Sequence, residues 1–144
     1  MKNTLSKTIK LFMKYSLLFS YGGFIYICLE LLFRHRTSVE MLFAGGLSFI
    51  IIGALNEFIS WDMPLVFQSL IGGIIITIIE LIFGVLFNQD FHIWDYRNIP
   101  LNYMGQICVP FSLLWCLLSV VAIILDDYLR YYIFDEEKPK YKIF

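Results

Sequence analysis

Charged residues are scarce in this chain, and most of them lie between long apolar runs. Of its 144 residues, 16% are charged and 59% are apolar, whereas an average soluble domain has about 25% charged and about 45–50% apolar residues. The mean hydropathy is +0.73. Such runs are typical of a protein that crosses a membrane. The net charge of -1 and the lack of a basic stripe argue against a nucleic-acid partner.

Motifs of common catalytic and nucleotide sites are missing as well. The sequence contains no G-x-x-x-x-G-K-[ST], no H-E-x-x-H and no G-x-S-x-G, so it predicts neither P-loop ATP binding nor these hydrolase sites. The three cysteines, Cys28, Cys108 and Cys116, are odd in number and irregular in spacing. This favours apolar packing over a disulfide framework or a metal site. We therefore expect no catalytic residue, no metal and no cofactor.

Four apolar runs have the length of membrane-spanning helices. They cover about residues 15–33, 41–59, 65–87 and 107–125. Each run corresponds to roughly 28–35 Å of helix, enough to cross a bilayer. We expect an all-α fold, an integral membrane four-helix bundle that forms one domain over residues 1–144. An ordered outer loop would occupy residues 88–106, and a cytoplasmic tail would begin near residue 130.

The distribution of Lys and Arg predicts the orientation. Four of these residues precede the first span and four follow the last span, whereas the turn 60–64 has none. An even number of spans places both tails on one side, and the positive-inside rule assigns that side to the cytoplasm. We expect a multi-pass protein of the cell membrane with both termini cytoplasmic. Glu57, Asp126 and Asp127 would lie at cytoplasmic helix ends, where water solvates them.

Two segments fifty positions apart resemble each other. GGFIYICLELLF, residues 22–33, and GGIIITIIELIF, residues 72–83, match at six of twelve positions, including Glu30 and Glu80. This indicates an internal repeat of two tandem helical hairpins. A carboxylate at the centre of a spanning helix costs about 2.5–3.5 kcal/mol on an insertion scale, and such residues usually mark functional sites. Two acids in one site of low dielectric would also not titrate independently.

Glycines near these acids predict close helix contacts, because no side chain separates the two backbones. Through such faces we expect helix packing and a homo-oligomer. The residues are Gly22, Gly23, Gly45, Gly46, Gly72 and Gly73.

The segment NQDFHIWDYRNIPLNYMGQ, residues 88–106, is the longest polar stretch between spans. Its amides and charges could bind a ligand above the two acids. In the alternative reading, the acids are locked by partners such as Arg34, and the polar groups of the loop satisfy one another. The candidate ligand-binding residues are Glu30, Glu80, Arg34, Asp95, Arg97, Asn98, Asn102 and Gln106.

Several motifs carry a family resemblance. YGGFIYICLELLF, GALNE followed by Trp-x-x-Pro-Leu, GGIIITIIELIFG, IWDYRNIPLNYMGQIC and LDDYLRYYIF are similar to the putative ABC-transporter type IV family of small bacterial membrane proteins. The resemblance extends from about Leu17 to the carboxyl terminus. It implies a permease-like component whose energy comes from a separate ATPase subunit and whose pathway is completed by an oligomer.

Three functions follow as alternatives. We expect a membrane transporter component with an acidic intramembrane site beneath the outer loop. The first alternative is a structural or regulatory subunit that binds a protein or membrane lipid. The second is a small membrane enzyme acting on a lipid head group, with Asp95, Arg97 and a Glu as its polar groups.

Overall fold

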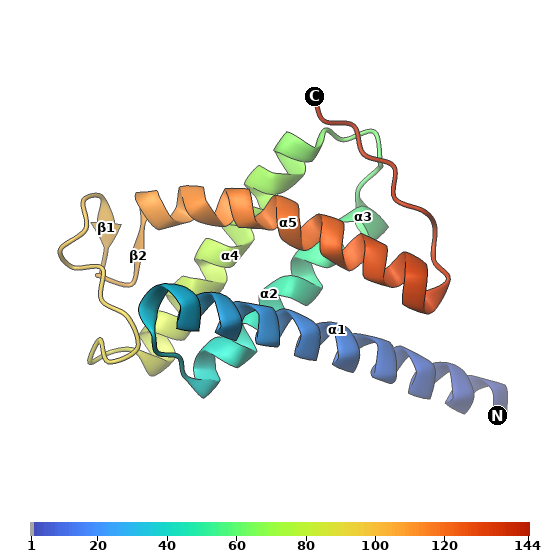
Figure 1. Ribbon diagram of the computed structural model, residues 1–144, viewed down its shortest axis with the longest axis horizontal. Coiled ribbons are helices and arrows are strands. Elements are labelled where there is room, and N and C mark those ends of the chain that lie inside the picture. Colours follow the sequence, from blue (N-terminus) through green and yellow to red (C-terminus); the bar gives the residue numbers. More distant parts are fainter. Residues whose placement is uncertain (1) are drawn as a thin grey trace.

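A computed structural model of the protein describes residues 2–144, with side chains from Thr4 onward. Over this range the regular structure is helical apart from one small antiparallel pair of strands, and loops connect the elements (Figure 1). Four of the described helical segments are long and apolar enough to cross a membrane, so the expected all-α membrane fold is confirmed. The elements are α1 (Lys2–Arg34), α2 (Val39–Gly53), α3 (Leu55–Phe58), α4 (Leu65–Phe87), β1 (Asn102–Tyr103), β2 (Ile107–Cys108) and α5 (Val109–Phe134).

Three of the four expected spans differ from the observed helices at their ends, and the expected span 41–59 is divided at Ala54 into α2 and α3. Helix α4 has the predicted bounds, because Pro64 precedes it and Asn88 caps its end. Helix α1 instead begins at Lys2, and α5 continues to Phe134, beyond the expected start of the tail. Lys, Leu and Met are good helix formers, so a helix continues through them without an apolar environment. At its other end, α5 begins at Val109 with Pro110 in its first turn, and β2 takes the two residues before it.

The chain forms two hairpins, α1 with α2 and α4 with α5, and α2 also contacts α4 and α5. Glycines allow the close approach inside each hairpin. An added Cβ at Gly22 would lie 2.2 Å from Cβ of Phe49, and one at Gly73 would lie 2.2 Å from Sγ of Cys116. The same holds for Gly23, Gly45, Gly46 and Gly72, which face Leu42, Tyr26, Phe19 and Ser119. These faces are occupied within one chain, so the expected homo-oligomer requires another surface.

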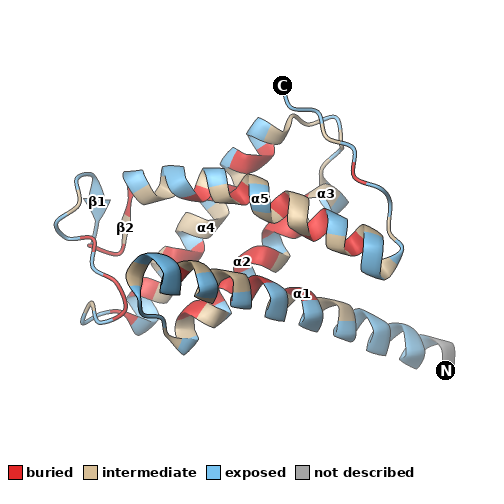
Figure 2. Ribbon diagram, viewed as in Figure 1, coloured by how far each residue is buried: buried red, intermediate tan, exposed pale blue. Residues whose placement is uncertain are grey.

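The outer faces of the helices are apolar and exposed. Figure 2 shows exposed residues along the outward sides of α1, α4 and α5, with buried residues turned toward the other helices. Large side chains such as Phe24, Ile74 and Leu117 are among the exposed ones. Exposed apolar surface on helices of this length suits contact with lipid. The protein is therefore a multi-pass membrane protein.

We call the end of the bundle that carries residues 35–38 and 88–108 the loop end. The opposite end, which carries residues 54–64 and 135–144, is the tail end. The tail 135–144 runs back from α5 to the start of α4 (Figure 1). The amide of Leu65 donates to the carbonyl of Lys142 over 2.6 Å, and the hydroxyl of Tyr141 donates to Asp127 over 2.7 Å. The tail thereby connects α4 and α5.

Asp126 and Asp127 are buried at the tail end, which corrects the expectation that water solvates them, whereas Glu57 is exposed as expected. Asp126 is fully buried and Asp127 is 5% exposed. Arg130 donates to Asp126 over 2.5 Å and also pairs with Glu57. Asp126 lies so close to α2 that a Cβ added at Gly53 would be 2.1 Å from its carboxyl carbon. The pairing joins the two hairpins and compensates the buried charge of Asp126, while Asp127 accepts hydrogen bonds from Asn56 and Tyr141.

We predict that Gly72→Ala destabilises the bundle by about 1–3 kcal/mol, because overpacking of a tight contact costs that much. The new methyl group would lie 2.6 Å from Oγ and 2.7 Å from Cβ of Ser119. The second substitution Ser119→Gly removes both atoms and should recover part of the loss. Denaturant unfolding in detergent measures both effects. As a control, Ile74→Val changes an exposed position. Equal stability of wild type and Gly72→Ala would contradict this account of the contact.

Candidate functional site

A cavity of about 110 Å³ lies between the two hairpins, with walls from α1, α2, α4, α5 and the loop. Most of its lining is aliphatic or aromatic. Of the described residues that line it, Glu80 is the one that carries a charge. Apolar pockets with few polar groups are typical of ligand sites.

Glu80 is 7% exposed and is bonded by two neutral donors. The hydroxyl of Tyr96 donates to Oε1 over 2.8 Å, and the indole N–H of Trp115 donates to Oε2 over 2.9 Å. Within the described residues, no Lys, Arg or His forms an ion pair with Glu80. Its carboxylate is therefore oriented by hydrogen bonds, and none of the described residues supplies a direct countercharge.

Glu30, the matching acid of the first hairpin, has different partners. It is 6% exposed, receives a bond from Arg34 over 2.7 Å and another from Thr37 over 3.0 Å. The second arm of Arg34 donates to the carbonyl of Ile93 over 2.5 Å. Glu30 is not among the residues that line the cavity. The two acids thus differ: Glu30 is neutralised by an ion pair, and Glu80 faces the cavity.

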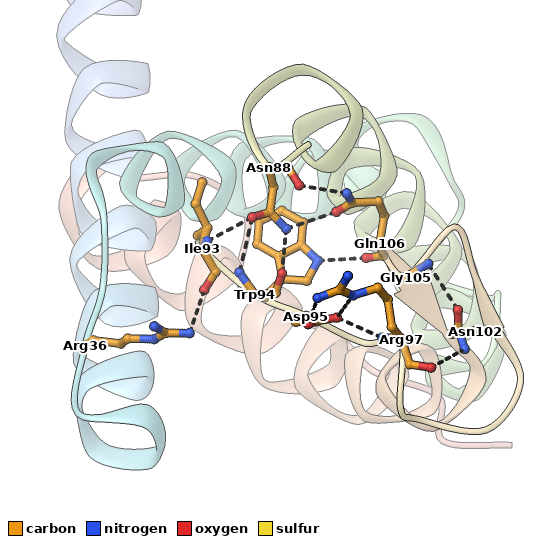
Figure 3. A network of polar contacts seen from close by, with 9 residues as sticks. All are labelled: Arg36, Asn88, Ile93, Trp94, Asp95, Arg97, Asn102, Gly105 and Gln106. Carbon is orange, nitrogen blue, oxygen red and sulfur yellow. Dashed lines mark hydrogen bonds and ion pairs between the residues drawn. The ribbon is translucent and has the colours of Figure 1, made fainter. Parts of the chain in front are cut away.

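The loop is organised by Asn88, which is fully buried at the end of α4 (Figure 3). Its Nδ2 donates to the carbonyl of Trp94 over 2.7 Å and to Oε1 of Gln106 over 3.0 Å. Its Oδ1 accepts the amide of Ile93 over 2.8 Å, and its carbonyl accepts Nε2 of Gln106 over 2.8 Å. The indole of Trp94 donates to the carbonyl of Gln106 over 2.9 Å. These bonds satisfy the buried polar groups of the loop.

The remaining loop candidates lie on the outside of the loop. Arg97 bonds Asp95 through Nε over 2.8 Å and Nη2 over 2.6 Å, and its guanidinium lies 4.2 Å from the ring centre of Phe91. Asn102 donates to the carbonyl of Ile99 over 2.9 Å, and Asn98 is exposed. None of these charged or amide side chains is among those that line the cavity. Of the eight candidates, the structure brings Glu80 alone to the cavity wall.

The profile of the family described as Putative ABC-transporter type IV matches residues 9–142. The chain belongs to the Putative ABC-transporter type IV family. Neither the curated proteins nor the solved structures provided a match. The family assignment therefore supports a membrane protein of transporter type. The position of a binding site has to be inferred from the geometry of this family member.

Sequence reasoning missed the donors that hold Glu80 in this member of the Putative ABC-transporter type IV family. Tyr96 was not among the candidate residues, yet it is 7% exposed and donates a hydrogen bond to Glu80. Burial, followed by the negative charge of Glu80, raises the pKa of Tyr96 above its usual range, so it stays a donor. The sequence could have indicated the role of Trp115, because an indole N–H in a spanning helix needs a hydrogen-bond acceptor. Glu80 is the nearby acceptor on the partner helix of its hairpin.

We predict that Asn88→Ala opens the loop of this family member, because the buried groups that Asn88 pairs would lose their partners. Each such group costs about 1–3 kcal/mol when left unsatisfied. Hydrogen exchange of the Ile93 amide should accelerate by at least tenfold. Asn102→Ala is the matched control, because Asn102 is exposed. Unchanged exchange in Asn88→Ala would show that the loop is held by other contacts.

We predict an unusually acidic Asp95. The hydrogen bonds from Arg97 lower the pKa of Asp95 to about 2, below the ordinary value of about 3.9. Since the folded value is the lower one, the pair stabilises the loop above about pH 3.9, and this contribution is lost as the pH falls through about 2. Carboxyl NMR should give the midpoint directly. Arg97→Gln should raise it toward the ordinary value, and an unshifted midpoint in that variant would contradict the assignment.

Proposed function

We propose that this protein is the membrane component of a transporter and binds its substrate in the cavity between the two hairpins. The observation that carries the proposal is Glu80, a buried carboxylate that faces an apolar cavity and has neutral donors as its partners. An unpaired charge inside a membrane segment is costly. A residue that serves only packing would avoid this cost. A substrate with a basic group could supply the charged partner that Glu80 lacks.

The place of the cavity supports the proposal. It lies where two separately packed hairpins meet, and α2 links both of them. Each hairpin begins with a helix that carries the Gly-Gly and Glu pattern, α1 with Glu30 and α4 with Glu80. In transporters built from repeats, the substrate site lies at the interface of the repeats, and rocking of one repeat against the other changes access to it. We propose the same relation here.

The two ends of the bundle would act as opposite closures of the cavity. At the loop end, Tyr96 and Trp94 come from the loop and lie against the Glu80 side. At the tail end, the pairing of Asp126, Arg130 and Glu57 connects the hairpins. Opening either end would require that these contacts separate. The tail end would face the cytoplasm, as the positive charge of both tails favours.

The proposal also includes the energy source of transport and a partner subunit that provides it. The sequence contains no P-loop motif, so ATP-driven transport by this chain would depend on a separate ATPase subunit. The family description is the support for such a subunit. A role as a lipid-head-group enzyme is not favoured, because Asp95 and Arg97 bind each other rather than facing Glu80.

The test is native mass spectrometry of the protein extracted gently from its host membrane. We expect wild type to retain a defined small molecule, and Glu80→Gln to lose it while its thermal melting stays close to that of wild type. Glu40→Gln is the matched control, since it removes the same charge at the start of α2, away from the cavity lining. Co-purification of an ATPase subunit with all three proteins is the second expected result.

Two outcomes would contradict the proposal. Wild type that holds only bulk lipid, in a stable complex with an unrelated membrane protein, would make this chain a structural or regulatory subunit. Equal retention of the small molecule by Glu80→Gln would remove Glu80 from the site.

A further inference from the structure

A series of neighbouring aromatic rings lies near Glu80, and three of them, Tyr26, Trp94 and Trp115, line the cavity. Tyr26 and Trp115 have ring centres 6.1 Å apart, and Trp115 is followed by Phe111 at the same distance. Phe111 stacks on Tyr96 with centres 4.6 Å apart and an interplanar angle of 15°. Trp94 completes the series at 6.5 Å from Tyr96. The rings come from α1, α5 and the loop, so three parts of the chain contribute to this wall.

The two carboxyl groups near this wall differ in their partners, and Glu80 has no basic partner among the described residues. Arg34 comes from the loop end of α1, but Glu30 and the carbonyl of Ile93 occupy its guanidinium. Arg34 and Glu30 therefore cancel each other, and Glu80 remains. Its two donors, Tyr96 and Trp115, are neutral. A cationic ligand would restore neutrality.

The lining decides which kind of cation fits. A metal ion such as Ca²⁺ needs six to eight oxygen ligands and Mg²⁺ needs about six. The described lining offers the carboxylate of Glu80 and the hydroxyls of Tyr26 and Ser48, and the rest is apolar or aromatic. Aromatic faces attract alkylated ammonium groups, and this attraction grows when the site is desolvated. The site therefore suits an organic cation rather than a metal ion.

We propose that the cavity binds a lipophilic organic cation, with an alkylated ammonium group between Glu80 and the aromatic wall. The apolar body of the ligand lies along the aliphatic part of the cavity, toward Ile52 and Leu125. This inference rests on the proposed function and names the substrate class of the same site. Glu80 supplies the charge, and Tyr26 and Trp115 supply the ring faces.

The test compares two probes of nearly the same shape, benzyltrimethylammonium and its neutral carbon analogue neopentylbenzene. Binding to the purified full chain in nanodiscs is followed by quenching of tryptophan fluorescence, since Trp94 and Trp115 line the cavity. We expect the cation to bind wild type at least tenfold more tightly than the neutral analogue. Glu80→Gln should lose at least tenfold in affinity for the cation and keep its affinity for the neutral analogue. Glu40→Gln should behave as wild type.

A second pair of variants tests the aromatic wall without changing the charge. Tyr26→Phe keeps the ring and should bind the cation as wild type does. Tyr26→Leu removes the ring and should weaken binding of the cation severalfold more than binding of the neutral analogue. Equal loss for both probes would show that Tyr26 acts through shape alone, and this would overturn the role of its ring face.

The outcomes separate this inference from the proposed function. Equal affinity of wild type for the two probes would overturn the organic-cation class and leave the cavity as a binding site. Binding of neither probe would also overturn it. The proposed function would fall if protein from host membranes retained no defined small molecule, whatever the result with the two probes.

Discussion

Glu80 accepts two hydrogen bonds, from the hydroxyl of Tyr96 and the indole of Trp115, and these bonds join α4, α5 and the loop at one point. All three residues are buried inside the protein, where little water reaches them. A polar group in that position must find its partner inside the protein. The loop is therefore folded onto the bundle, because Tyr96 has to reach Glu80 and Trp94 has to reach Gln106. The cavity between the hairpins is the space that these bonds leave open.

The sequence was sufficient for features that depend on local composition. Apolar runs predicted four spanning helices, and the bounds of α4 were correct because Pro64 and Asn88 mark its ends in the sequence. The extended ends of α1 and α5 were not predicted, since Lys10 and Arg130 are polar but favour helix. The glycine spacing pointed to close helix contacts. It did not say which helix would be the partner, because that depends on the hairpin pairing of the chain.

The hydrogen-bond and ion-pair partners of Glu30 and Glu80 could not be predicted from the sequence. Glu30 and Glu80 occupy matching positions in similar segments, yet Arg34 follows only Glu30. Whether Glu80 would have a cation depended on the path of the loop, which brought the neutral Tyr96 to it instead. Asn88 and Gln106 illustrate the same limit. Their amides bond backbone groups of the loop, and such bonds follow from tertiary structure rather than from spacing.

The contact between Gly53 and Asp126 has a consequence for how this protein changes over evolutionary time. Any side chain at position 53 would occupy the space of the Asp126 carboxyl group, and Asp126 in turn holds Arg130 in place. A single replacement at either position therefore disturbs both the helix contact and the buried charge. Where another residue replaces glycine at position 53, we expect a smaller residue at position 126 as well. A substitution at either position thus acts on the same contact, although 73 positions separate the two residues along the chain.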